Sequence, residues 1–227
     1  MNPRPSRHIS SEFDRHFAVL VEGVLRMADC GRKAYEAATK ALLQGNTDLA
    51  VQAIGMDDEI DLLDKDLGRE GLDMIMRFSP TADDLRRVVS CLRMLPDLER
   101  IGDECVSIAK RARRIAVGGP LPQVEMLREA VLLVRDLLGD ALHAFDDMNG
   151  NFAALLPARD RAIDASLNDV MLSIAAIMES VPGEDTPRLV DLLLASRSLE
   201  RIGDHAKNLA EEVVFATTGE DVRHELA

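Results

Sequence analysis

The sequence is poor in aromatic residues, and this scarcity narrows the fold class. Only 3% of the 227 residues are aromatic, with no Trp and a single Tyr, Tyr35, although 47% are hydrophobic. The cores of β-sandwiches draw on aromatic and β-branched side chains, whereas helical bundles interdigitate aliphatic ones. The composition therefore favours a helical core built from Leu, Ile, Val, Ala and Met.

Cysteines and long apolar runs are also scarce. Cys30, Cys91 and Cys105 show no CxxC spacing, so the sequence indicates neither a disulfide framework nor a thiolate zinc site. Residues 1–11 lack the apolar stretch of a signal peptide. No other run approaches the roughly 20 apolar residues that a membrane span requires. These features predict a cytoplasmic protein without a transmembrane segment.

The chain has fewer basic residues than acidic ones. The chain has 27 Lys and Arg against 40 Asp and Glu, which gives a formal net charge of −13. Proteins that bind nucleic acid usually present a basic surface, so we expect no nucleic-acid partner. An acidic excess instead suits cations or basic protein surfaces.

Apolar residues recur at steps of three and four along the whole chain, the spacing of amphipathic helices. Helix-breaking Gly, Pro and Asn residues separate six helical segments. The predicted helices span 10–43, 47–78 and 82–117 in the first half, and about 124–148, 160–181 and 186–218 in the second.

Helix ends and one internal proline give further expectations. We expect Asn46 or Thr47 to cap the second helix, Thr81 the third and Thr186 the sixth. Pro96 lies inside the third helix and should kink it.

One stretch occurs twice. Leu-Glu-Arg-Ile-Gly-Asp fills positions 98–103 and again 199–204, an offset of 101, and the apolar stripe of the third helix shifts onto that of the sixth. A Gly- and Pro-rich linker at 118–122 separates the copies. The sequence therefore predicts an all-α fold of two tandem antiparallel three-helix bundles related by an internal repeat, spanning residues 8–118 and 121–218.

Paired carboxylates mark both copies. Residues four apart lie one turn apart on one helix face. Four such acid-xxx-acid pairs lie on the second and third helices of the two copies: Asp57 and Asp61, Glu99 and Asp103, Asp160 and Asp164, and Glu200 and Asp204. Gly102 and Gly203 lie inside two of the pairs, where a missing side chain would let another helix or an ion approach.

Like charges at this spacing are destabilising unless something offsets them. A bound cation is the simplest offset, and oxygen-only ligands suit Mg, Mn, Ca or carboxylate-bridged Fe. The alternative is a salt-bridged surface that binds nothing, because Arg100, Arg197, Arg201 and Lys207 lie close in sequence. His205 follows Asp204 and could add a nitrogen ligand, although a lone histidine is more often an ordinary polar residue.

Four basic residues end the third helix: Lys110, Arg111, Arg113 and Arg114. They complement the helix dipole or, alternatively, form a docking surface for an acidic partner.

The doubled motif, with Asp-x-x-Ile-Asp on each preceding helix, resembles the PhoU family of phosphate-uptake regulators over residues 8–216. The resemblance implies a cytoplasmic regulator of phosphate-starvation signalling rather than an enzyme. It implies an adaptor between the ATPase subunit of the phosphate ABC transporter and a sensor histidine kinase, recruited to the membrane through these partners. A homodimer is left open.

The resemblance also implies that the eight paired carboxylates bind divalent or trivalent metal ions (Mg, Mn, Fe or Zn). Asp103 is followed by Glu104, whereas Asp204 is followed by His205, so we expect the two sites to differ. Two alternatives stay open. One is a carboxylate-bridged dimetal enzyme, although such bundles usually use Glu-xx-His ligand pairs, which these motifs lack. The other is a structural bundle without metal.

Overall fold

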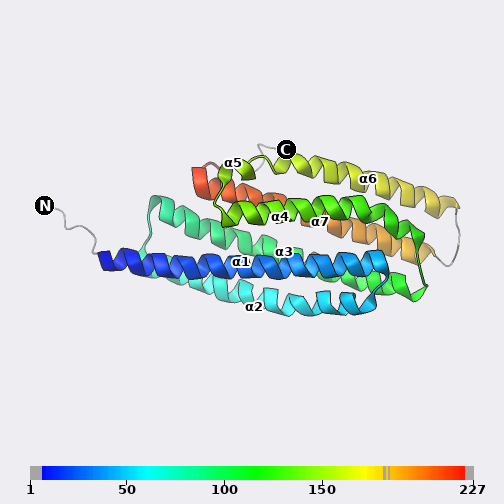
Figure 1. Ribbon diagram of the computed structural model, residues 1–227, viewed down its shortest axis with the longest axis horizontal. Coiled ribbons are helices and arrows are strands. Elements are labelled where there is room, and N and C mark those ends of the chain that lie inside the picture. Colours follow the sequence, from blue (N-terminus) through cyan, green and yellow to red (C-terminus); the bar gives the residue numbers. More distant parts are fainter. Residues whose placement is uncertain (1–6, 181–182, 184, 223–227) are drawn as a thin grey trace.

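The computed structural model describes residues 7–180, 183 and 185–222. Long helices run along one common axis and no strand occurs among these residues, so the predicted all-α fold is confirmed (Figure 1). In order, the helices are α1 (Arg7–Gln44), α2 (Thr47–Phe78), α3 (Ala82–Val117), η1 (Pro122–Leu127), α4 (Arg128–Asp146), α5 (Gly150–Ala153), α6 (Pro157–Ser180) and α7 (Thr186–Thr218).

The first three helices follow the predicted boundaries closely. Asn46 caps α2 by accepting hydrogen bonds from the backbone N–H groups of Asp48 and Leu49. Thr81 occupies the N-cap position of α3 in an extended conformation, but its side chain forms no capping hydrogen bond. α3 continues through Pro96, and the bend predicted there stays a prediction.

The second half departs from the prediction at helix ends. The fourth segment opens as the 3₁₀ helix η1, where Pro122 occupies the first turn, before α4 begins. α5 adds one helical turn where only a turn of the chain was expected, and Asn149 caps it by accepting from the Phe152 N–H.

The N-cap of α7 is also corrected. Thr186 was predicted to cap this helix, but it is already the first helical residue and Asp185 is the cap. The Asp185 carbonyl accepts the first intrahelical bond, from the Leu189 N–H, which places the boundary one residue earlier. Residues 181, 182 and 184 of the predicted break lie outside the described part of the chain.

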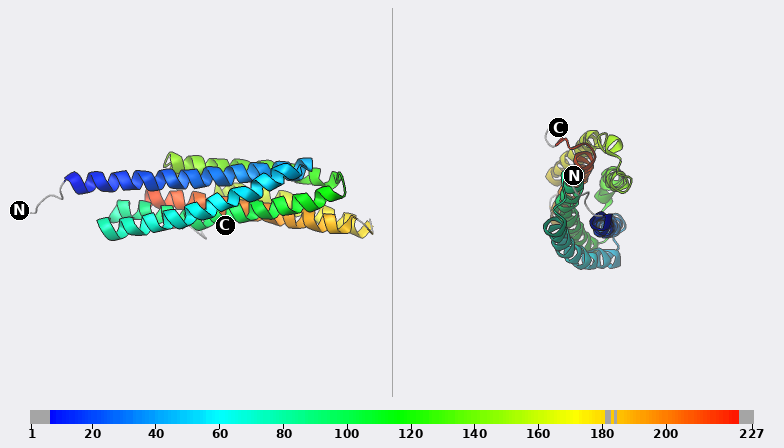
Figure 2. Two further views of the ribbon diagram at one scale, coloured as in Figure 1. Left: turned by 90° about the horizontal axis from the view of Figure 1, so that it is seen from below. Right: turned by 90° about the vertical axis from the view of Figure 1, so that its left-hand side faces the viewer.

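Both copies share one hydrophobic core. α3 and α7 run antiparallel and make the most extensive helix–helix contact of the described chain. The end-on view in Figure 2 shows them near the middle of the cross-section, with α2 and α6 at opposite ends. The repeated stripe is buried in both copies, for example Leu98 and Ile101 on α3 and Leu199 and Ile202 on α7. The division into domains at 8–118 and 121–218 stays a prediction.

None of the described helices is long and apolar enough to cross a lipid bilayer.

Candidate functional site

The predicted carboxylates lie near enough to shift one another's pKa in two groups, one on each copy, which we call the two clusters. The first cluster lies between α2 and α3 and the second between α6 and α7. The first cluster consists of Asp57, Asp61, Glu99 and Asp103, and the second of Asp160, Asp164, Glu200 and Asp204. The two clusters belong to different helix pairs, and their outer helices α2 and α6 lie at opposite ends of the cross-section (Figure 2).

In the first cluster the carboxylates of the two helices repel one another. Burial raises the pKa of Asp57, and the negative charges of Asp61 and Asp103 raise it further. Burial likewise raises the pKa of Glu99, with Asp103 and Asp61 adding to the shift. Charges from α2 therefore act on α3 and the reverse, which is the pairing that the sequence predicted.

Gly102 makes this approach of α2 and α3 feasible. A Cβ atom at this position would lie 2.8 Å from Asp57 Oδ1 and 3.0 Å from Ile60 Cδ1, closer than ordinary van der Waals contact. The corresponding contacts at Gly203 are looser, 3.5 Å to Ile163 and 3.6 Å to Asp160 Oδ1. The first copy therefore depends on its glycine more strictly than the second.

The second cluster contains the most buried of the eight carboxylates. Asp160 is only 6% exposed, and its Oδ1 atom has no hydrogen-bond partner. Burial raises the pKa of Asp160, and the charge of Asp164 raises it further. Burial also raises the pKa of the Asp204 carboxyl, with Asp160, Asp164 and Glu200 adding to the shift, even though Asp204 as a whole residue is exposed.

Basic side chains neutralise part of each cluster. In the first, exposed Arg100 lies 3.4 Å from Glu99 Oε2 and 3.2 Å from Asp103 Oδ2. In the second, Arg197 pairs with Glu200 at 2.7 Å, and the Lys207 Nζ lies 3.4 Å from Asp160 Oδ2.

The salt-bridged surface is therefore only a partial description of the clusters. Among the described residues, four of the eight carboxylates form neither an ion pair nor a hydrogen bond: Asp57, Asp61, Asp164 and Asp204.

The clusters suit a cation chemically without presenting a finished coordination shell. In the described part of the chain, no three His, Cys, Asp or Glu side chains converge closely enough to hold a metal ion. The all-oxygen donor set fits hard cations, and the buried Asp160 Oδ1 atom has no hydrogen-bond partner among the described residues. A metal would be held by the facing carboxylates of α2 and α3, or of α6 and α7.

His205 does not join the second cluster. Its Nδ1 atom lies 2.7 Å from Asp97 Oδ1 on α3, and the Asn208 side chain donates to the same oxygen at 2.9 Å. The structure thus favours the reading of His205 as an ordinary polar residue. Sequence reasoning missed this bridge because no local spacing links Asp97 to a residue 108 positions later.

Other polar contacts also cross between the copies. Arg201, inside the second repeated motif, pairs with Glu104 of the first copy at 2.9 Å. Arg114 donates two hydrogen bonds to Asp191 through Nε and one through its terminal nitrogen, at 2.6–3.0 Å. The two motifs are therefore linked through the α3–α7 interface.

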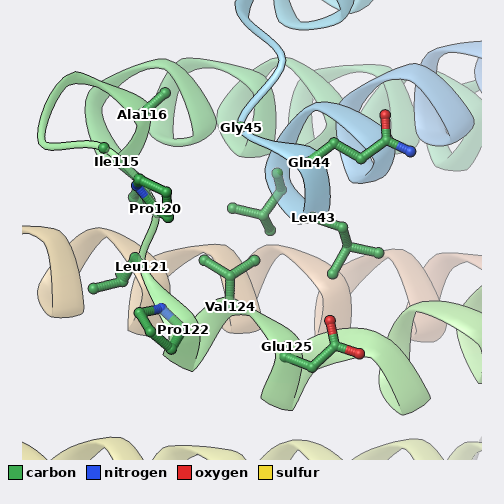
Figure 3. Close-up of a pocket in the computed structure, with 12 residues that line it drawn as sticks. Leu43, Gln44, Gly45, Ile115, Ala116, Pro120, Leu121, Pro122, Val124 and Glu125 are labelled. Atoms are coloured by element: carbon green, nitrogen blue, oxygen red, sulfur yellow. The ribbon is translucent and has the colours of Figure 1, made fainter.

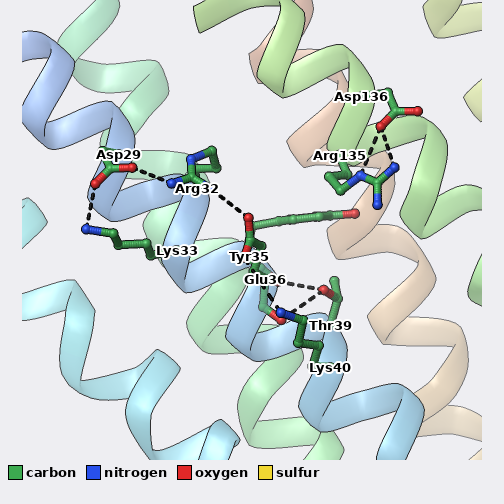
Figure 4. Close-up of polar contacts among 9 residues, drawn as sticks. All are labelled: Asp29, Arg32, Lys33, Tyr35, Glu36, Thr39, Lys40, Arg135 and Asp136. Carbon is green, nitrogen blue, oxygen red and sulfur yellow. Dashed lines mark hydrogen bonds and ion pairs between the residues drawn. The ribbon is translucent and has the colours of Figure 1, made fainter.

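Three hollows of the described surface are lined by none of the eight carboxylates. One of about 380 Å³ is lined by the turn after α1 and by the linker that contains Pro120 and Pro122 (Figure 3). Another lies between α1 and α4, where the hydroxyl of buried Tyr35 donates to the Val131 carbonyl at 2.7 Å. Figure 4 shows Tyr35 among the polar side chains of α1, with Arg135 and Asp136 of α4 nearby. A third lies beside Lys110 and Arg113.

Comparisons with known proteins agree with the doubled motif. The PhoU domain family matches residues 24–112 and 127–213. A phosphate-specific transport system accessory protein PhoU homolog of Pseudomonas putida is 33% identical over 221 residues, which cover 96% of this chain and 86% of that protein. A homolog with the same description from Pseudomonas aeruginosa is 32% identical over 96% of this chain and 90% of its own length.

Solved structures show the same architecture. The crystal structure of PhoU from Pseudomonas aeruginosa superposes with a TM-score of 0.88 at 30% identity, covering 92% of this chain and 100% of that one. The phosphate transport system regulatory protein PhoU from Streptococcus pneumoniae superposes with a TM-score of 0.83 at 25% identity, covering 92% and 98%.

Proposed function

The chain belongs to the PhoU family, and on that premise we propose that it regulates phosphate uptake and the phosphate-starvation response. The relatives named above are accessory proteins of the phosphate-specific transport system, which supports a regulatory role rather than catalysis. When phosphate is plentiful, the protein keeps phosphate-starvation genes repressed.

The protein acts as an adaptor at the inner face of the membrane. Its partners in this proposal are the ATPase subunit of the phosphate ABC transporter and the sensor histidine kinase of the phosphate two-component system. The hydrophobic core that α3 and α7 share supports this role, because it packs both copies together so that the protein can present two surfaces at once.

The two carboxylate clusters are its metal sites, and each holds a divalent or trivalent ion such as Mg, Mn, Fe or Zn. One observation carries this proposal: the same acid-xxx-acid pairs face each other across α2 and α3 and again across α6 and α7. Unneutralised repulsion repeated at both places is destabilising, and a bound cation would offset it.

The test is a deletion of the gene with a reporter of phosphate-starvation transcription. In high phosphate the deletion strain should express the reporter, and the wild-type gene should restore repression. A variant with Asp57→Asn and Asp160→Asn should restore it poorly, whereas Asp169→Asn, an exposed position on α6 outside both clusters, should restore it fully. Full repression in the deletion strain would contradict the proposed function.

The adaptor role has its own readout. The ATPase subunit and the kinase should each co-purify with the tagged wild-type protein, and neither should do so from the deletion strain complemented with an empty vector. If neither partner is recovered in high or low phosphate, the adaptor role is wrong even where the deletion alters repression.

A further inference from the structure

The two clusters differ in one partly buried lysine side chain. We infer that Lys207 serves as a built-in counter-ion of the second cluster, competes there with a metal ion, and makes the second cluster the weaker of the two metal sites. This inference rests on the proposed function, because it presumes that the clusters bind metal.

Lys207 lies beside the most buried carboxylate of the second cluster. Its side chain is 23% exposed and its Nζ lies 3.4 Å from Oδ2 of Asp160, whose side chain is 8% exposed. The other oxygen of Asp160 is buried and has no hydrogen-bond partner. One oxygen of the deepest carboxylate is thus occupied by an ammonium group, while the other is left for a further cation.

The internal repeat supplies the comparison. The offset of 101 residues aligns Lys207 with Val106, which is buried in the core of the first copy. No ammonium group can therefore take this place in the first cluster. Lys110 attracts Asp57 only weakly, and the two form no ion pair within the described residues.

The remaining bases do not remove this difference. Arg100 of the first cluster is 62% exposed and Arg197 of the second is 54% exposed, so water screens both to a similar degree. Arg201, which aligns with Arg100, pairs instead with Glu104 of the first copy. Lys207 is thus the shielded cation that one cluster has and the other lacks.

A shielded positive charge affects metal binding in two ways. It repels an incoming divalent ion, and it must give up its contact with Asp160 before that carboxylate can coordinate with both oxygens. For an ammonium group about 6 Å from a divalent ion, with the dielectric constant of water, the repulsion corresponds to about tenfold in affinity. Lys207 therefore sets the order in which the clusters fill.

The test is calorimetric titration of the full-length, chelator-treated protein with Mn²⁺. The wild type should show a tighter and a weaker class of site. Lys207→Gln and Lys207→Val, the latter copying the first repeat, should tighten the weaker class about tenfold and leave the other unchanged. Lys33→Gln, an exposed lysine paired with Asp29 on α1, is the matched control and should change neither class.

A variant that lacks the first cluster shows which class of binding site belongs to which cluster. In a protein with Asp57→Asn and Asp103→Asn, only the weaker class should remain, and Lys207→Gln should still tighten it. Two equal sites, or a weaker class that Lys207→Gln leaves unchanged, would overturn the inference while metal binding stands. If neither the wild type nor Lys207→Gln binds Mn²⁺, then the metal sites of the proposed function fail, and the inference falls with them.

Discussion

Neutralising Asp204 should stabilise the metal-free protein, the opposite of what removal of a structural salt bridge would do. Asp204 forms no ion pair or hydrogen bond within the described residues. Burial raises its pKa, and the negative charges of Asp160, Asp164 and Glu200, which outweigh the weaker attraction of Lys207, raise it further. Like-charged neighbours destabilise by roughly 0.2–0.5 kcal/mol per pair at exposed positions. Three such pairs give roughly 0.5–1.5 kcal/mol, reduced by salt screening.

The assay is thermal unfolding of Asp204→Asn beside the wild type, both treated with chelator at low ionic strength. For a chain of this length, 1 kcal/mol corresponds to about 2–4 °C in Tm. The variant should therefore melt about 1–6 °C higher, and the control Asp169→Asn, at an exposed position on α6, should melt with the wild type. Added Mn²⁺ should reverse the order, because a ligand at 100 times its Kd stabilises by about 2.7 kcal/mol and Asp204→Asn weakens that binding.

The pH dependence of the stability difference between the wild type and Asp204→Asn is a second, independent test. Because the folded-state pKa of Asp204 is raised, its ionised form destabilises the fold above that pKa. As the pH falls through the raised pKa toward the ordinary value of a carboxyl group, near 4, the wild type regains this stability and the gap between the proteins closes. A metal-free Asp204→Asn that melts below the wild type at neutral pH would refute the reasoning.

The structure predicts three further outcomes, for glycine substitutions, for a buried hydrogen bond and for thiol reactivity. Gly102→Ala should destabilise the protein by about 1–3 kcal/mol in urea unfolding because its Cβ would crowd Asp57, whereas Gly203→Ala has room and should be neutral or stabilising by up to about 1 kcal/mol. Equal effects would argue against the difference in helix spacing. Tyr35→Phe should lower stability by about 1 kcal/mol, since it removes a buried hydrogen bond between α1 and α4; an unchanged urea midpoint would contradict this. In the folded protein only Cys30 should react with a thiol reagent at pH 8, because the other two cysteines are buried; three fast thiols would show that the core opens.

Helical periodicity predicted much of the architecture. The buried stripes of α3 and α7 lie where the three–four spacing placed them, because each helix has only one face apolar enough to bury. The same logic predicts that the four acids of the repeated motif are half-buried on the flank of the stripe. This is correct for Glu99 and Glu200 and wrong for Asp103 and Asp204, which are exposed. Caps and helix ends were less predictable, since Asp185 and Thr186 are both acceptable first residues and the backbone path decides between them.

Contacts between the copies could not be predicted. Periodicity specifies which face of a helix is buried but not which distant helix covers it. The sequence offered Arg201 as a base for the second cluster, but in the fold it pairs with Glu104 of the first copy. Asp97 likewise meets His205 of the other copy, a contact that no local spacing indicates. The reach of Lys207 to Asp160 belongs to this class as well, because it depends on the packing distance between α6 and α7.

The central claim is that the doubled motif builds two cation sites, and metal stoichiometry tests it most directly. Elemental analysis after Mn²⁺ loading and desalting should be done on the wild type, on Asp57→Asn with Asp103→Asn, and on Asp160→Asn with Asp204→Asn. Each double substitution should abolish the metal bound at one cluster and leave the other. Unchanged metal content in both variants, or no retained metal in the wild type, would contradict the account.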